Sequence, residues 1–163
     1  MTTQISGTTG VSQVQAGSIN QDDLAANVVG KGPAFRANSA VTGVMSVGAW
    51  AKLVMSTEVF DTANAYDTSL YRFTPQTAGY YQVNCSIKTN GTSGNIGVAV
   101  FKNGSMYSNS GYLVTSTGAM GTSFSDLVYL NGTTDYIEMY GYSSVGNSTH
   151  EVSFFSGFLA RAA

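Results

Sequence analysis

The sequence of 163 residues is short of charge, proline, cysteine and histidine. Charged residues make up 10% of it, against roughly a quarter in a typical soluble domain. So few charges protect a free monomer poorly from association, which favours a protein that works inside an assembly. The net charge of −2 leaves no excess of Lys and Arg to neutralise phosphates, so we expect no nucleic-acid partner.

Long apolar runs are also missing, and they fall far short of the roughly 20 residues that cross a membrane, so no membrane partner is expected. The first residues, Met1 to Ser6, have neither the basic nor the apolar segment of a secretory signal. Cys85 is the single cysteine, which rules out an intrachain disulfide and fits a reducing compartment. These features predict synthesis in a cytoplasm.

The sequence has too few reactive side chains for a recognisable active site. His150 is the only histidine and follows Asn147-Ser148-Thr149 in a predicted loop. Cys85 lies on the apolar face of a predicted strand, where a thiol acts as a small hydrophobe. One Cys and one His cannot form a zinc site, and Asp61 and Asp67 fall short of the about six to eight oxygens that Ca²⁺ takes. We therefore expect no enzyme activity, no metal and no cofactor.

Gly, Ser, Thr, Asn, Tyr and Phe are abundant instead, a mixture typical of short strands joined by tight turns. The clearest strand runs from Tyr80 to Lys88, where Tyr81, Val83 and Ile87 share the apolar face with Cys85. We expect Tyr81 to lie in the core. Further strands are predicted at 95–102, 124–130, 135–142 and 152–159. The pattern predicts an all-β sandwich or barrel.

Turn residues punctuate this region. Asn-Gly dipeptides occur at 90–91, 103–104 and 131–132, and Asn-Gly favours two-residue hairpin turns because both residues tolerate positive φ. The two prolines, Pro33 and Pro75, come before predicted strands and do not interrupt them.

Residues 1–32 differ from the remainder, 33–163, and we divide the chain there into an arm and a domain. The arm is too polar to hold itself together, so it is either a disordered leader or a segment anchored by a partner. Residues 20–26 look like one or two helical turns with Asn20 as N-cap. Widely spaced apolar residues could serve as anchors: Ile5, Val11, Val14, Ile19 and Leu24.

One set of spacings in the domain is specific. Asp61 is followed by Tyr66, then Phe73, then Gly79-Tyr80-Tyr81, and the chain closes through Gly157-Phe158. These residues resemble the signature of C1q-like domains, which belong to the C1q and tumour-necrosis-factor (TNF) jelly-roll superfamily. The resemblance covers residues 33–161.

The resemblance implies a jelly-roll β-sandwich that forms a homotrimer around a three-fold axis. It implies that the signature residues belong to the family core. Met55, Val83 and Cys85 stand where the family has aromatic residues, and these are apolar exchanges that leave the core pattern intact.

The arm resembles segments of small bacteriophage virion proteins, through Ile5 to Ser12, Val14 to Ile19 and Asp23-Leu24-Ala25. Together the two resemblances predict a phage capsid cement (decoration) trimer on the exterior of the head, which binds the major capsid protein through its arm. The alternative is the receptor-binding tip of a tail or head fibre, with a fibre or tail protein and a host-surface glycan as partners. Cement is favoured because the arm is too short for a shaft and has no heptads. A carbohydrate hydrolase is a third hypothesis, which the lack of a catalytic constellation disfavours.

Overall fold

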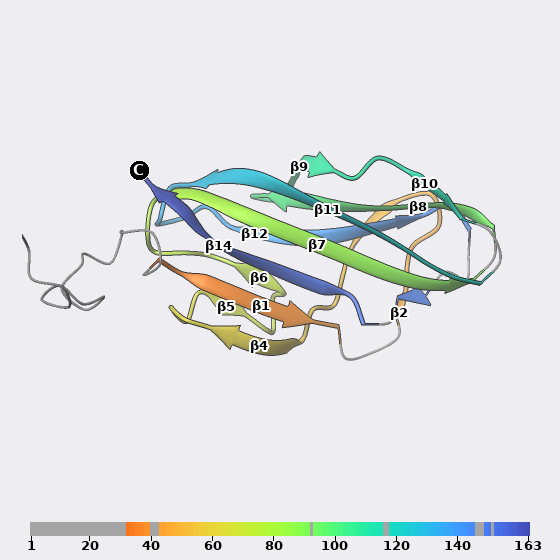
Figure 1. The fold of residues 1–163 in the computed structure, drawn as a ribbon, viewed down its shortest axis with the longest axis horizontal. Helices are drawn as coiled ribbons and strands as arrows, with labels where there is room; N and C mark the ends of the chain where they lie inside the picture. The colour runs from red at the N-terminus through yellow and green to blue at the C-terminus, as the bar shows by residue number, and fades with distance from the viewer. Residues whose placement is uncertain (1–31, 40–42, 92, 116–117, 146–148, 151) are drawn as a thin grey trace, which may run out of the picture.

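The computed structural model describes residues 32–39, 43–91, 93–115, 118–145, 149–150 and 152–163, and Figure 1 shows their fold. Every regular element in these ranges is a β-strand, and there are fourteen of them. The predicted arm anchors and the predicted helical turn at 20–26 lie outside the described residues.

The first of two sheets has seven strands. Its strands are β1 (Ala34–Asn38), β2 (Gly43–Val44), β4 (Thr57–Asp61), β7 (Gly79–Gly91), β11 (Gly118–Leu130), β13 (Thr149–His150) and β14 (Phe154–Ala162). They follow the order β4–β1–β14–β7–β11, and β13 and β2 continue the sheet beside the C-terminal end of β7. We call it the β7 sheet.

The second sheet also has seven strands. Its strands are β3 (Trp50–Lys52), β5 (Tyr66–Asp67), β6 (Arg72–Phe73), β8 (Gly94–Lys102), β9 (Ser105–Asn109), β10 (Leu113–Thr115) and β12 (Ile137–Ser143). Here β12 and β8 lie at the centre, with β3 and β6 along β12 and with β9 and β10 along β8. We call it the β8 sheet. All pairs of named strands in both sheets are antiparallel.

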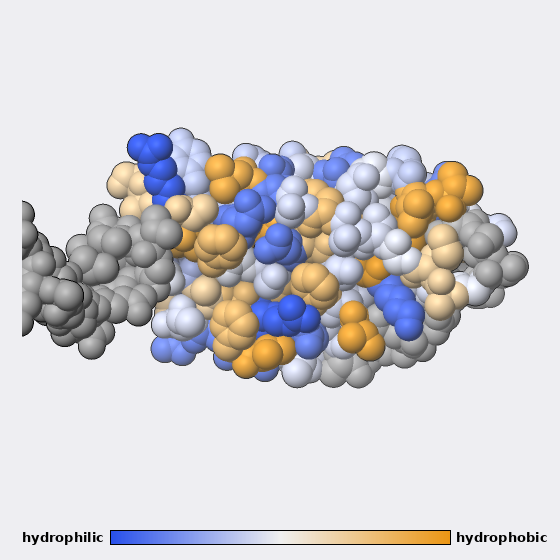
Figure 2. Space-filling view, viewed as in Figure 1, coloured by the Kyte–Doolittle hydropathy of each residue, from blue (hydrophilic) through white to orange (hydrophobic). Residues whose placement is uncertain are grey.

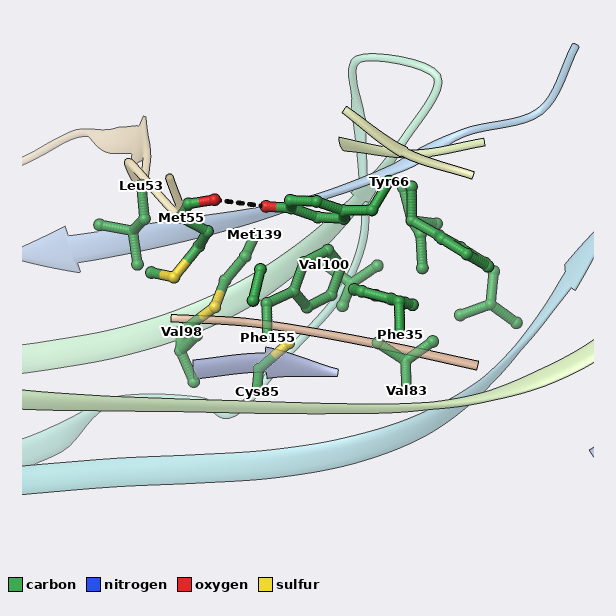
Figure 3. Close-up of a cluster of buried hydrophobic side chains, with 14 of the residues drawn as sticks. Phe35, Leu53, Met55, Tyr66, Val83, Cys85, Val98, Val100, Met139 and Phe155 are labelled. Carbon is green, nitrogen blue, oxygen red and sulfur yellow. Dashed lines mark hydrogen bonds between the residues drawn. The ribbon is translucent and has the colours of Figure 1, made fainter. Parts of the chain in front are cut away.

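The inner faces of the two sheets form one core, drawn in part in Figure 3. Along β7, Tyr81, Val83 and Ile87 are all buried, which confirms the predicted register of this strand. They pack against apolar residues of the β8 sheet such as Val98 and Met139. The alternation of β7 was therefore a reliable signal, because a half-buried strand must show its apolar residues at every second position.

Aromatic rings fill the centre of this core. The ring of Phe35 stacks on Phe73 at 4.2 Å and on Tyr66 at 5.3 Å between centroids, and meets Phe155 edge-on at 5.0 Å. The Tyr66 hydroxyl donates a hydrogen bond to the carbonyl oxygen of Met55 at 2.8 Å, drawn as the dashed line in Figure 3. Residues from both sheets thus meet in one ring cluster, which fixes how the sheets lie against each other.

The three Asn-Gly dipeptides have three different roles. Asn103 and Gly104 form the predicted two-residue hairpin turn between β8 and β9, with φ angles of 52° and 78°. The prediction for Asn90-Gly91 is wrong, because β7 continues through these residues and pairs them with β11. The prediction for Asn131-Gly132 is also wrong. This pair begins a connection from one sheet to the other, since β11 pairs with β7 and not with β12.

Candidate assembly surface

The residues with the greatest chemical reactivity are not arranged for catalysis. Cys85 is fully buried in the core, and burial raises the pKa of its thiol, which keeps the sulfur protonated and unreactive. His150 belongs to β13, which pairs with β2 and β7, so its prediction as a loop residue is wrong. Pairing with two segments that are distant in the sequence, Gly43–Val44 and the end of β7, defines this short strand, which no local sequence pattern indicates.

The two candidate calcium ligands are both engaged in turns. One oxygen of Asp61 accepts the backbone N–H of Tyr66 at 2.6 Å, and the other accepts that of Ala63 at 3.1 Å. The hydroxyl and N–H of Ser69, with a further backbone N–H, lower the pKa of Asp67. In the described part of the chain, no three His, Cys, Asp or Glu side chains are grouped to hold a metal ion.

The resemblance to the C1q signature also assigned residues to the core, and the structure gives each a position. Phe73 and Tyr81 are fully buried, and Tyr66 is 7% exposed. A side chain at Gly79 would collide with the carbonyl oxygen of Arg161, and one at Gly157 would come within 3.0 Å of the Phe35 ring. Asp61 differs from these residues, because its carboxylate fixes the turn between β4 and β5 and packs no core.

Phe158 does not belong to the core. It points away from the β8 sheet and is 47% exposed, because β14 alternates and places its neighbours Gly157 and Leu159 inward. The prediction that this ring is a core residue is therefore wrong. The correction matters for function, because it adds Phe158 to the exposed apolar side chains on the outward face of the sheet.

Phe158 is one of four exposed large apolar side chains that the adjacent strands β14, β7 and β11 place on the outward face of the β7 sheet. Leu127, Tyr80 and Tyr129 are 46%, 42% and 39% exposed, and backbone pairing brings β14, β7 and β11 side by side here. We call Tyr80, Leu127, Tyr129 and Phe158 the assembly surface. In Figure 2 apolar residues are spread among polar ones across the region that Figure 1 shows as β1, β14 and β7.

Two depressions lie on this face. One is lined by Tyr80, Leu127 and Tyr129 together with the C-terminal residues 160–163. The other lies over the middle of the sheet and is bordered by small polar side chains and the Phe154 ring. Exposed rings next to shallow depressions allow a partner surface of complementary shape to pack closely against this face.

The edge of the molecule beside β11 extends the same surface. Tyr107 of β9 is 47% exposed, and its hydroxyl donates a hydrogen bond to the carbonyl oxygen of Leu127 at 3.3 Å. The neighbouring Met106 is 42% exposed. Exposed apolar side chains thus continue around the edge from one sheet toward the other.

A charged contact fixes the two sheets together near this edge. The Lys102 ammonium lies 2.8 Å from a carboxylate oxygen of Asp135 and donates to the carbonyl oxygen of Tyr129 at 2.8 Å. The hydrogen bonds from Lys102 and then Asn103 lower the pKa of Asp135. Because Lys102 is already paired, it adds little free charge next to Tyr129.

Sequence reasoning missed most of the assembly surface. The signal that was missed is a break in the alternation of apolar and polar residues. Tyr80 and Phe158 occupy outward positions, whereas other outward residues of the same strands, Gln82, Asn84 and Ser156, are polar. Large apolar side chains on the polar side of a strand indicate a covered face. Because the inward side of β7 was predicted correctly, the outward position of Tyr80 could have been read from the sequence, whereas that of Phe158 required the structure.

The fold is a C1q/TNF-like jelly roll. The globular domain of zebrafish complement 1qA superposes with a TM-score of 0.63 at 13% identity, over 81% of this chain and 99% of that one. Murine APRIL superposes with a TM-score of 0.61 at 9% identity, over 79% and 99%. The PRD1 vertex protein P5 gives a TM-score of 0.53 at 18% identity, over 78% and 96%.

These likenesses establish the fold, which confirms the predicted C1q/TNF-like sandwich. No protein-family model matches the sequence, and no curated protein matches it. Among the described residues, no helix is long and apolar enough to cross a membrane.

Proposed function

We propose that the protein is a non-enzymatic structural protein of a phage virion, a homotrimer that decorates the exterior of the capsid and binds the major capsid protein through its N-terminal arm. The observation that carries the proposal is the assembly surface, a set of exposed apolar side chains on a C1q/TNF-like jelly roll of low charge. Exposed apolar side chains gathered on a surface of low charge favour association with a partner.

A second copy of the chain is the partner that fits. The exposed rings lie on the β7 sheet and continue around the β9 edge, so the edge of one copy can pack on the sheet of the next. Three such contacts, repeated head to tail, close a ring of three. The resemblance to C1q and TNF jelly rolls implies the same arrangement.

Two likenesses support the virion role. The fold is similar to that of the PRD1 vertex protein P5, which favours a phage structural function. The arm resembles segments of phage virion proteins. A trimer carries three arms, so it multiplies a weak contact with the capsid by avidity. Such a trimer would bridge neighbouring capsid subunits and hold the shell against the pressure of packed DNA.

The absence of catalysis is part of the proposal. Cys85 is buried and protonated, and the carboxylates of Asp61, Asp67 and Asp135 are occupied by hydrogen bonds within turns and ion pairs. We expect Cys85→Ser to weaken folding without abolishing any binding activity, and His150→Ala to leave binding intact.

Two measurements test the proposal in turn. Analytical ultracentrifugation of the full chain should give about three times the monomer mass at micromolar concentration. The full chain and a variant lacking residues 1–24 are then mixed with phage heads depleted of the protein and sedimented. We expect both to be trimers and only the full chain to pellet.

Other results would redirect the assignment. A clean monomer would refute the trimer, and equal pelleting of both proteins would show that the arm is not the anchor. Binding of both to host cells and of neither to heads would replace cement with the fibre-tip alternative.

A further inference from the structure

The outward face of the β8 sheet carries a compact group of three aromatic rings. Trp50 of β3 lies 5.5 Å from Tyr142 of β12 and 6.2 Å from Tyr112, which precedes β10, and the two tyrosine rings are 4.8 Å apart. We call these three residues the aromatic cluster. It lies outside the assembly surface, on the opposite sheet.

A glycine makes room for the cluster. Gly97 of β8 pairs with Tyr142, and it is the residue beneath the rings. A Cβ at this position would lie 2.9 Å from Cη2 of Trp50 and 3.0 Å from the carbonyl oxygen of Gly111, so any larger residue would displace them. The lack of a side chain at Gly97 thus leaves space for the three rings to pack together.

The segment that presents Tyr112 is held in place by hydrogen bonds. The backbone N–H of Ser110 donates to the carbonyl oxygen of Val98 at 2.8 Å, and the Ser110 hydroxyl accepts the N–H of Val98 at 3.1 Å. Gly111 adopts a φ of 70°, which a residue with a side chain would adopt only with strain, and directs the chain back over Gly97. The ring of Tyr112 is therefore positioned before any ligand arrives.

The rings are accessible and the site is neutral. Tyr112 is 58% exposed, while Trp50 and Tyr142 are half-buried against the sheet. The rings, Gly97 and the segment 109–112 include no charged residue. Lys52, the nearest charge along β3, is paired with Glu138 at 2.8 Å.

The cluster lies at the end of the sandwich that is farthest from both ends of the described chain. In Figure 1 the start of β1 and the C-terminus lie at one end, and β10 lies toward the other. Tyr142 is near the C-terminal end of β12, and it pairs with Gly97 next to the residues of β8 that pair with β10. If the chain is anchored through its N-terminus, this end faces outward.

We propose that the aromatic cluster is a binding site for a neutral saccharide, whose sugar ring stacks on the exposed ring of Tyr112 next to Trp50 and Tyr142. The C–H bonds of a sugar face carry a slight positive charge that complements the negative face of an aromatic ring. The phenol hydroxyls of Tyr112 and Tyr142 supply a donor and an acceptor each for sugar hydroxyls. An anionic sugar would need a free cation, and the charged residue nearest along the strand is already paired.

The compactness of the cluster separates a saccharide from a peptide. Three rings within 6.2 Å of one another cover the area of one or two sugar rings, whereas a proline-rich peptide needs an extended aromatic groove. The inference goes beyond the virion role and does not depend on which particle surface carries the protein.

The sole tryptophan of the chain makes the test specific, because its fluorescence reports on this site alone. The full-length protein is titrated with neutral oligosaccharides built from glucose, mannose, galactose or N-acetylglucosamine. We expect a saturable change in Trp50 emission in the millimolar range with at least one of them. Tyr112→Ala keeps the reporter and should weaken binding at least tenfold while the protein stays folded, which the cooperativity of thermal unfolding checks.

Phe60→Ala is the matched control, since it removes an exposed ring on β4, away from the cluster, and should leave the affinity unchanged. The proposal is overturned if no neutral saccharide gives a saturable response, or if Tyr112→Ala binds as tightly as the natural chain. A response to a proline-rich peptide or to acidic sugars in place of neutral ones also overturns it. Because the free protein is used, these outcomes are independent of binding to phage heads.

Discussion

The two sheets share one core and differ in what they show to solvent. On the outward face of the β7 sheet, the assembly surface contains one ring pair, Tyr80 and Tyr129 at 5.4 Å between centroids. Its other two residues, Leu127 and Phe158, lie on different strands with the polar Gln82 between them. On the β8 sheet, rings pack on one another: Phe101 stacks on Tyr140 at 3.7 Å between centroids, and the aromatic cluster gathers three more rings.

The difference indicates two kinds of partner. Apolar side chains dispersed over several strands can be covered only by a broad surface, such as another copy of the chain. Three rings that contact one another over a glycine form instead a compact, preorganised site for a small ligand. Four predictions test this contrast, from the largest expected effect to the smallest.

The shared core should be the most sensitive to change. Tyr81→Ala should lower the free energy of unfolding by about 3–5 kcal/mol, because it leaves a cavity against Phe73 where both sheets meet. Urea denaturation measures the loss. Tyr81→Phe removes only the hydrogen bond from the hydroxyl to the carbonyl oxygen of Thr77, so it should cost about 1 kcal/mol. Equal effects of the two variants would refute a packing role for the ring.

A charge on the assembly surface should separate the subunits without unfolding them. Phe158→Asp would bury a carboxylate in the trimer contact and should weaken association by about 3 kcal/mol or more, roughly a hundredfold. Sedimentation should show a folded monomer at micromolar concentration. Thr68→Asp, which adds the same charge to an exposed turn between β5 and β6, should remain a trimer. A trimeric Phe158→Asp protein would contradict the assembly surface.

The rings of the β8 sheet should stabilise the single subunit. A double-mutant cycle of Phe101→Ala and Tyr140→Ala should give a coupling energy of about 0.5–1.5 kcal/mol for their stacked contact. The same cycle for Phe158 and Leu127 should give no coupling in a monomeric background. Equal coupling on both faces would remove the contrast between the sheets.

The contribution of the Lys102–Asp135 ion pair to stability should depend on pH. Hydrogen bonds from Lys102 and Asn103 hold the pKa of Asp135 below its ordinary value of 3.8, so its contribution to stability is present above that value and is lost as the pH falls through the lowered pKa. The unfolding temperature, measured between about pH 2 and 6, should fall as the pH approaches the acid end of this range. Asp135→Asn should be less stable at pH 6 and show a smaller acid-side fall. An unchanged pH profile would contradict the assignment.

Local patterns in the sequence were reliable where neighbours along the chain decide the structure. The alternation of Tyr81, Val83 and Ile87 marked the buried face of β7, and Asn103-Gly104 marked a hairpin turn. The same dipeptide at 90–91 and 131–132 predicted hairpins that do not form, because its strands pair with partners that the turn does not connect. An Asn-Gly dipeptide indicates where the chain can turn, but it does not determine which strands pair with each other.

The sequence by itself determined an all-β sandwich of the C1q/TNF type with Tyr81 in its core, because period-two alternation and signature spacing are properties of neighbouring residues. Only the tertiary structure decided that Phe158 faces outward in the same row as Leu127, across Gln82, and that Trp50, Tyr112 and Tyr142 meet over Gly97. These groups join residues from strands far apart in the chain. Their proximity depends on strand order and register, which long-range pairing sets and local sequence does not encode.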